Sequence, residues 1–252
     1  DGRERFLSNF RKHRGEFVEP HPLAAEHIEP WPSGRSNHYW FDMNRDWFLH
    51  SQRETQAKVQ AYLDWQPQVY VDAHEMGRNA TYFFMPSREP VNPFTLTRQR
   101  EWMLRIGRHQ AKHFDDHGFR YTTREIFDSF YPGYGSEWPT IQGGLGILWE
   151  QAGVRGLAIA RDDETQLLYP DSVRHHYVSA LATIEVAAEH RASLLRDFHE
   201  AQKRSMQLGA DGPIRHYFLL EENRPHRAAD QEPLLVVNRI DGYRTARPFP
   251  AP

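Results

Sequence analysis

The chain has 252 residues, which is enough to bury a sizeable core as one large domain, or as one domain and a fragment of a second. The formal net charge is −3, so we expect no strong field for nucleic acid or a membrane surface and predict neither as a partner. The absence of cysteine excludes disulfides and thiolate metal sites, and no apolar run approaches the roughly 20 residues of a membrane-spanning helix.

The first part of the chain predicts a short helix, a long loop, a strand and a second helix. Residues 1–14 are polar and basic, and residues 15–38 are rich in Pro, Glu, His and Ser, which indicates a loop. Residues 39–43 (YWFDM) are typical of a strand, and Asn44 follows it directly. Helical spacing of apolar residues then extends over residues 52–65.

Residues 69–73 (VYVDA) form the most informative predicted element. β-branched and aromatic residues between Pro67 and Gly77 are typical of a short buried strand. His74 follows at its C-terminal end, which is where open α/β sheets place their binding sites. A strand that follows a helix in this way also indicates a layered α/β fold.

The remainder of the chain continues this alternation. The other apolar runs predicted as strands are 82–85, 145–149 and 156–160. Residues 96–117 and 172–208 predict helices, and residues 131–144, rich in Gly and aromatic side chains, predict a mobile rim over a site. Glu150 lies at the end of its strand, as His74 does.

The last segment differs in composition from the rest. Two β-like runs, 216–220 and 234–237, lie between polar stretches. We therefore predict a domain over residues 1–208 and a tail, or the start of a second domain, over residues 209–252.

Taken in order, several short motifs resemble the zinc carboxypeptidase family of the carboxypeptidase A type, over about residues 1–200. The motifs are Asp1-Gly2, Asn44-Arg45 at a strand end, His74 after an apolar strand, Tyr131 in a Gly-rich loop, and Glu150 at a strand end. Longer phrases, such as Asp42-Met43-Asn44-Arg45-Asp46-Trp47, resemble a bacterial branch with large multi-domain members. The resemblance implies an α/β fold of three layers, with a mixed central β-sheet and helices on both faces.

The resemblance also implies a role for each matched residue. His74 would be one ligand of a single Zn²⁺ ion, whose bound water has a lowered pKa. Glu150 would be the general base that takes the proton of that water. Arg14, twelve residues after Gly2, would stabilise the oxyanion, with Arg11 as the alternative.

The remaining matched residues would bind substrate. Arg45, with Asn44 beside it, would hold the substrate's C-terminal carboxylate through the guanidinium fork. Tyr131, or Tyr134 as the alternative, would close over the substrate. We therefore predict a zinc-dependent metallocarboxypeptidase, whose partner is a peptide with a free C-terminal carboxylate.

One departure from the family pattern concerns the metal. The family's first two zinc ligands come from a His-x-x-Glu motif ahead of the turn that ends in Asp1-Gly2, so we expect a catalytic domain truncated at its N-terminus. The one His-x-x-Glu here, residues 13–16, lies on the wrong side of that turn.

Two functions are alternatives to a metallocarboxypeptidase. One is a deacylase or amidase on the same zinc core, and the other is a non-catalytic module that binds peptide carboxylates.

Three histidines on the predicted helix 96–117 present a competing pattern. His109, His113 and His117 follow each other at intervals of four, so they share one helix face, and two of them could bind a metal. No Glu occupies the second position of a His-Glu-x-x-His motif. We therefore interpret them as a solvated or partly packed helix face.

Overall fold

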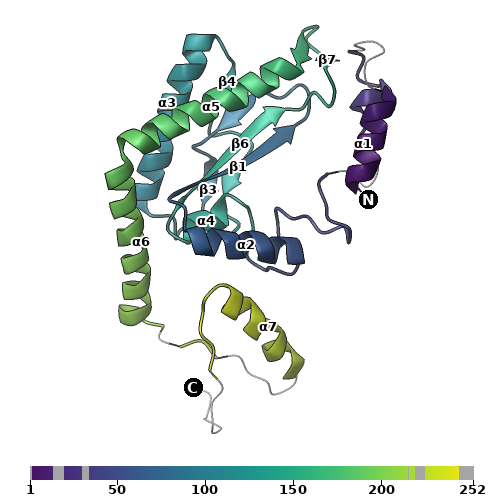
Figure 1. Ribbon diagram of the computed structural model, residues 1–252. Coiled ribbons are helices and arrows are strands. Elements are labelled where there is room, and N and C mark those ends of the chain that lie inside the picture. Colours follow the sequence, from purple (N-terminus) through teal and green to yellow (C-terminus); the bar gives the residue numbers. More distant parts are fainter. Residues whose placement is uncertain (1, 14–19, 30–33, 215, 219–224, 244–252) are drawn as a thin grey trace.

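The structure is a computed structural model, which describes residues 2–13, 20–29, 34–214, 216–218 and 225–243 (Figure 1). Its helices are α1 (Gly2–His13), the short 3-10 helix η1 (Ala25–His27), α2 (Arg53–Trp65), α3 (Thr97–His117), α4 (Glu137–Ile141), α5 (Tyr169–Glu189), α6 (Arg191–Asp211) and α7 (Pro225–Val237). Its strands are β1 (Val69–Met76), β2 (Tyr82–Phe84), β3 (Arg88–Val91), β4 (Tyr121–Thr122), β5 (Asp128–Ser129), β6 (Leu145–Ala152), β7 (Ala158–Ala160) and β8 (Gln166–Leu168).

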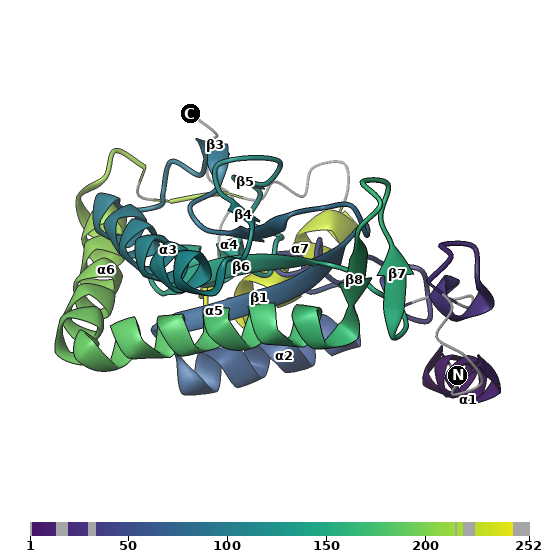
Figure 2. The same ribbon diagram turned by 90° about the horizontal axis from the view of Figure 1, so that it is seen from above.

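The principal sheet is mixed and has the strand order β1-β6-β2-β4. β1 and β6 are parallel over eight residue pairs, from Val69 opposite Leu145 to Met76 opposite Ala152, whereas β2 runs antiparallel to β6. Helices α3, α4 and α5 all contact β6, so the central strand of this sheet is covered by helices (Figures 1 and 2). The predicted α/β class with a mixed sheet is confirmed.

Alternate residues of β1 pack into two different hydrophobic clusters, as the period of two in a strand requires. Val69 and Val71 pack against the larger cluster, which is formed by β2, β6, α3 and α5. Tyr70 packs against a smaller cluster, which includes Trp138 of α4 and residues of α2. Asp72 and His74 follow Tyr70 at intervals of two, so their side chains lie on the same face of the sheet as Tyr70.

The predicted helices over 52–65 and 96–117 match α2 and α3 closely. α3 ends at Gly118, whose φ of +68° lies in the left-handed region that glycine adopts without strain. The predicted helix over 172–208 is instead two helices, α5 and α6, which meet at His190. The backbone of His190 leaves the helical conformation there, with φ −106° and ψ 16°, so the chain changes direction.

The predicted strand over residues 39–43 is wrong. This segment contains only one isolated bridge, between Ser36 and Asp42, and the side chain of Tyr39 is 71% exposed. The φ of Trp40 is +68°, which is incompatible with an extended strand. The side-chain oxygen of Asn37 accepts hydrogen bonds from the N–H groups of Tyr39 and Phe41, so a local turn replaces pairing with a neighbouring strand.

Two further segments differ from prediction. The predicted rim loop contains α4, and residues 234–237 of the tail belong to α7 instead of a strand. Residues 216–218 form no regular structure, and residues 219 and 220 lie outside the described part. After α7, the side-chain oxygen of Asn238 accepts a hydrogen bond of 3.1 Å from Trp138, so the tail contacts the domain. Among the described helices, none is long and apolar enough to cross a membrane.

Candidate active site

The C-terminal ends of β1 and β6 bring His74 and Glu150 next to each other. The two residues are directly opposite in the parallel pairing, and register partners on neighbouring strands point to the same face of a sheet. Each side chain influences the charge of the other, because the Glu150 carboxylate raises the pKa of His74 and His74 lowers that of Glu150. An imidazole and a carboxylate therefore share one face at the end of this sheet.

His74 is held by a small polar network. Its Nε2 atom lies 2.8 Å from the Oδ1 atom of Asp72 and 2.8 Å from the side-chain nitrogen of Asn44. The same Asn44 nitrogen donates a 3.0 Å hydrogen bond to the second oxygen of Asp72. The hydrogen bond with Asp72 raises the pKa of His74, and partial burial opposes that shift.

Gly135 connects the loop after β5 to this network through a backbone hydrogen bond. Its N–H donates a 2.6 Å hydrogen bond to the Oδ1 atom of Asn44. A Cβ atom at this position would lie 2.6 Å from the Oδ2 atom of Asp72 and 2.9 Å from the indole nitrogen of Trp47, so only glycine allows this approach. Both the nitrogen and the oxygen of the Asn44 side-chain amide therefore form hydrogen bonds within the protein. The contact of Asn44 with substrate stays a prediction.

Glu150 has the electrostatic properties of a proton acceptor at neutral pH. The residue lies on β6 between β1 and β2, with His74 and Phe83 as its strand partners, and it is only 8% exposed. Burial raises the pKa of Glu150 to about 7, and the positive groups His74 and Arg35 oppose that shift. A carboxyl group that titrates near neutrality can accept and release a proton under the same conditions.

The predicted carboxylate clamp lies beside this network, next to two tyrosines. The guanidinium carbon of Arg45 lies 4.5 Å from the centre of the Tyr134 ring, and the Tyr131 hydroxyl donates a 3.1 Å hydrogen bond to the Arg45 carbonyl. Arg45 forms none of the ion pairs found among the described residues, whereas Asp42 pairs with Arg35 at 2.9 Å. The structure therefore contains no salt bridge between Arg45 and either Asp42 or Asp46.

The predicted oxyanion residue cannot be placed. Arg14 lies outside the described residues, as do the last three residues of the His-x-x-Glu at 13–16. Arg11, the alternative, lies on α1, where it is exposed.

Two residues that sequence reasoning missed lie at this site. Asp72 precedes His74 by two positions, so the period of two in a strand could have revealed it. Arg35 lies in a segment predicted as loop, and its charge acts on both His74 and Glu150. No sequence pattern distinguishes Arg35 from other basic loop residues.

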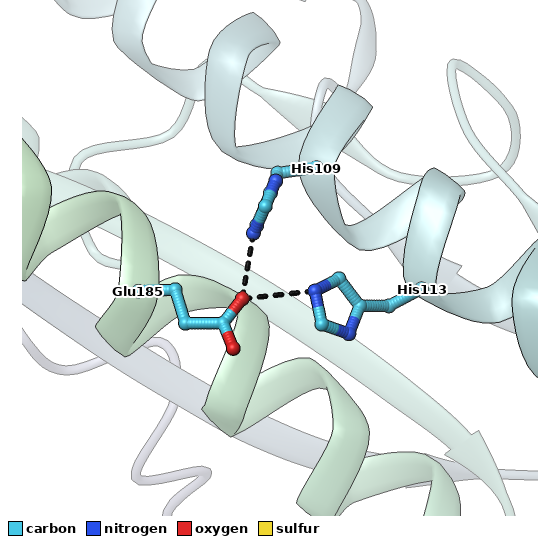
Figure 3. Close-up of side chains that lie close together, drawn as sticks. All are labelled: His109, His113 and Glu185. Carbon is cyan, nitrogen blue, oxygen red and sulfur yellow. Dashed lines mark hydrogen bonds and ion pairs between the residues drawn. The ribbon is translucent and has the colours of Figure 1, made fainter.

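A second group of polar side chains lies elsewhere, between α3 and α5. His109 and His113 of α3 both face Glu185 of α5 (Figure 3). The potential ligand atoms of the three residues lie within 4.8 Å of one another, and the group could hold a metal ion. The interpretation of these histidines as a solvated or partly packed face omitted Glu185, which comes from a different helix.

The zinc ion that the resemblance implies needs more ligands than the described residues supply at the sheet end. A catalytic zinc site uses three protein ligands and keeps one position open. His74 and Asp72 are the adjacent donors, and Glu150 is the predicted base. In the part of the chain that the structure covers, these residues alone do not complete the predicted zinc centre.

No family model, no curated protein and no solved structure matches this chain. The resemblance to the zinc carboxypeptidases therefore depends on the short motifs and on the arrangement of the residues that carry them.

Proposed function

We propose that this chain carries the general base, one metal ligand and the carboxylate clamp of a zinc-dependent metallocarboxypeptidase. The observation that supports this proposal is the pairing of His74 with Glu150 at the ends of two parallel strands, on one face of the sheet. Asn44, with Arg45 next to it in the chain, joins this pair through contacts with Asp72 and His74.

We propose in addition that the fold has three layers, with helices on both faces of the sheet. Val69 and Val71 pack into one hydrophobic cluster and Tyr70 into the other. This alternation supports a three-layer arrangement with helices on both faces of the sheet, as in the zinc carboxypeptidases.

In this proposal Glu150 moves the proton. Its carboxylate takes a proton from the attacking water and transfers it to the amine that leaves when the peptide bond breaks. A pKa of about 7 suits both transfers, because the group is present in both protonation states near neutral pH. His74 and Asp72 are the polar side chains beside Glu150 at this end of the sheet.

Arg45 binds the substrate's terminal carboxylate. One guanidinium nitrogen of Arg45 donates a 2.8 Å hydrogen bond to the Asn44 carbonyl, and the remaining N–H groups would bind the carboxylate oxygens. The Tyr131 hydroxyl, which is bonded to the backbone carbonyl of Arg45, lies next to this clamp. Recognition of a terminal carboxylate restricts cleavage to the last peptide bond.

The proposal includes one Zn²⁺ ion, with His74 as a ligand. The remaining ligands of that ion would be residues that the structure does not place at the sheet end. A peptide-binding module without catalysis is the second candidate, because the described residues supply a single histidine at the sheet end. A deacylase or amidase would use the same Glu150 and differ in not requiring a free carboxylate.

The test is release of the C-terminal amino acid from N-acylated dipeptides by the natural gene product, supplied with Zn²⁺. We expect release by the wild type, a loss of about 10²- to 10⁴-fold in Glu150→Gln, and no cleavage of substrates whose C-terminus is an amide. Equal rates for the wild type and Glu150→Gln would overturn the role of Glu150. Cleavage of amide-capped substrates at the same rate would indicate the deacylase or amidase. Binding of free-carboxylate peptides without any release would indicate the binding module.

A further inference from the structure

The histidine pair on α3 is arranged as a set of metal ligands together with Glu185. His109 and His113 are one helical turn apart, and their Nε2 atoms lie 2.8 Å and 2.9 Å from the same Oε2 atom of Glu185 (Figure 3). The two imidazole rings meet edge to face, with centres 4.8 Å apart. Three donor atoms from two helices therefore converge on one small volume.

The two helices that carry these side chains are held together by direct packing. α3 and α5 each have 21 residues and pack directly on each other. Gln110, next to His109, donates a buried 3.4 Å hydrogen bond to the hydroxyl of Thr183 on α5. The two helices are thus joined beneath the histidine pair, and their separation at that point is fixed by the core.

The side chains themselves are partly open to solvent. The exposed fractions are 32% for His109, 19% for His113 and 44% for Glu185. The Oε2 atom of Glu185 faces both imidazole rings, so it is placed to act as a ligand together with them. A hydrated ion can reach the group, and the side chains can rotate slightly to adjust their donor atoms.

The chemistry of the donors selects the class of metal. Two imidazole nitrogens and one carboxylate oxygen suit Zn²⁺ and similar transition metals, whereas Mg²⁺ and Ca²⁺ prefer oxygen ligands throughout. Zinc forms bonds of about 2.0–2.2 Å to such atoms, and two histidines at i and i+4 on a helix are a recurrent pair of zinc ligands. Water would fill the remaining position on the solvent side.

We propose that His109, His113 and Glu185 bind one divalent transition-metal ion of the Zn²⁺ type, which links α3 to α5. The ion would take the place of the direct contacts that the two imidazoles make with the Glu185 carboxylate. This site is separate from the sheet end, since it uses neither His74 nor Glu150, and it does not depend on the proposed peptidase activity.

The test is titration of the purified, chelator-treated protein with ZnCl₂, followed by calorimetry and by thermal unfolding. The measurements are made in the His74→Ala background, so that zinc at the sheet end does not contribute. We expect one bound ion per chain, and a rise in Tm of roughly 5 °C at a zinc concentration 100 times the Kd. MgCl₂ at the same concentration should leave the Tm unchanged.

Variants identify the ligands. His113→Ala and the nearly isosteric Glu185→Gln should each weaken zinc binding by at least about 100-fold and abolish the rise in Tm. His117→Ala is the matched control, because His117 lies one turn further along α3 and bonds to the backbone carbonyl of His113. Zinc binding that persists in Glu185→Gln, or that is lost equally in His117→Ala, would overturn the proposal. If His113→Ala fails to fold, Glu185→Gln alone decides between these outcomes.

Discussion

Replacing Glu150 by glutamine should change how the stability of the protein depends on pH. Burial raises the pKa of Glu150 to about 7, from an ordinary value of 4.5, so the folded protein disfavours the ionised carboxylate. Below pH 4.5 the carboxyl group is protonated in both the folded and the unfolded chain. As the pH rises to about 7, the unfolded chain ionises first, and the folded state progressively loses stability relative to it.

The size of the effect follows from that difference in pKa. Between 4.5 and about 7, at about 1.4 kcal/mol for each pH unit, the wild type loses about 3 kcal/mol of unfolding free energy through this group. Glutamine does not ionise, so Glu150→Gln avoids this loss. The variant should therefore gain about 3 kcal/mol on the wild type between pH 4.5 and pH 8, with no further gain at higher pH.

The assay is urea denaturation of both proteins across this pH range, in the presence of a chelator. Glu137→Gln is a matched control, because Glu137 is fully buried and burial raises its pKa to about 7 as well. It should show a similar gain in stability. The pKa of His74 distinguishes the two variants, because the Glu150 carboxylate contributes to raising it. The His74 titration, followed by NMR, should move to lower pH in Glu150→Gln alone. Parallel stability curves for Glu150→Gln and the wild type would refute a buried, neutral carboxyl group at this position.

Three other changes test the site and its framework. Arg45→Lys should weaken binding of a peptide with a free C-terminus by about 10-fold or more and leave its amide-capped form unaffected, as measured by calorimetry; equal losses would contradict the clamp. Asn44→Ala should lower the unfolding free energy by about 1–3 kcal/mol, because its partly buried partners Asp72 and His74 lose their hydrogen bonds, and an unchanged urea midpoint would argue against the network. Gly146→Ala should cost at least about 3 kcal/mol, since a Cβ atom there would overlap the carbonyl oxygen of Ser136, and a soluble variant of wild-type stability would show that α4 can move away from β6.

The strands that carry the site could be predicted because their residues favour one structure strongly. Residues 69–73 alternate Val with other side chains and residues 145–149 are largely apolar, and both belong to the parallel pair β1 and β6. The C-terminal ends of two parallel neighbouring strands lie side by side, so the two apolar runs were enough to predict that His74 and Glu150 are close.

Contacts between distant segments could not be predicted in this way. The hydrogen bond from Asn44 to Asp72 joins a loop to a strand, and the contact of Glu185 with His109 depends on how α3 packs against α5. Each requires the tertiary arrangement, which no local spacing encodes. The strand predicted at 39–43 failed for a related reason, because aromatic residues favour strands only where a partner strand is available.

The position of β1 in the sheet has a consequence for any partner of this chain. Within the described residues β6 is its one neighbouring strand, so the opposite margin of β1 offers backbone N–H and C=O groups along a row that contains Val71 and Ala73. A polypeptide that added itself there would lie beside the strand that carries His74. Assembly at this margin and the chemistry of His74 would then be coupled through the position of β1.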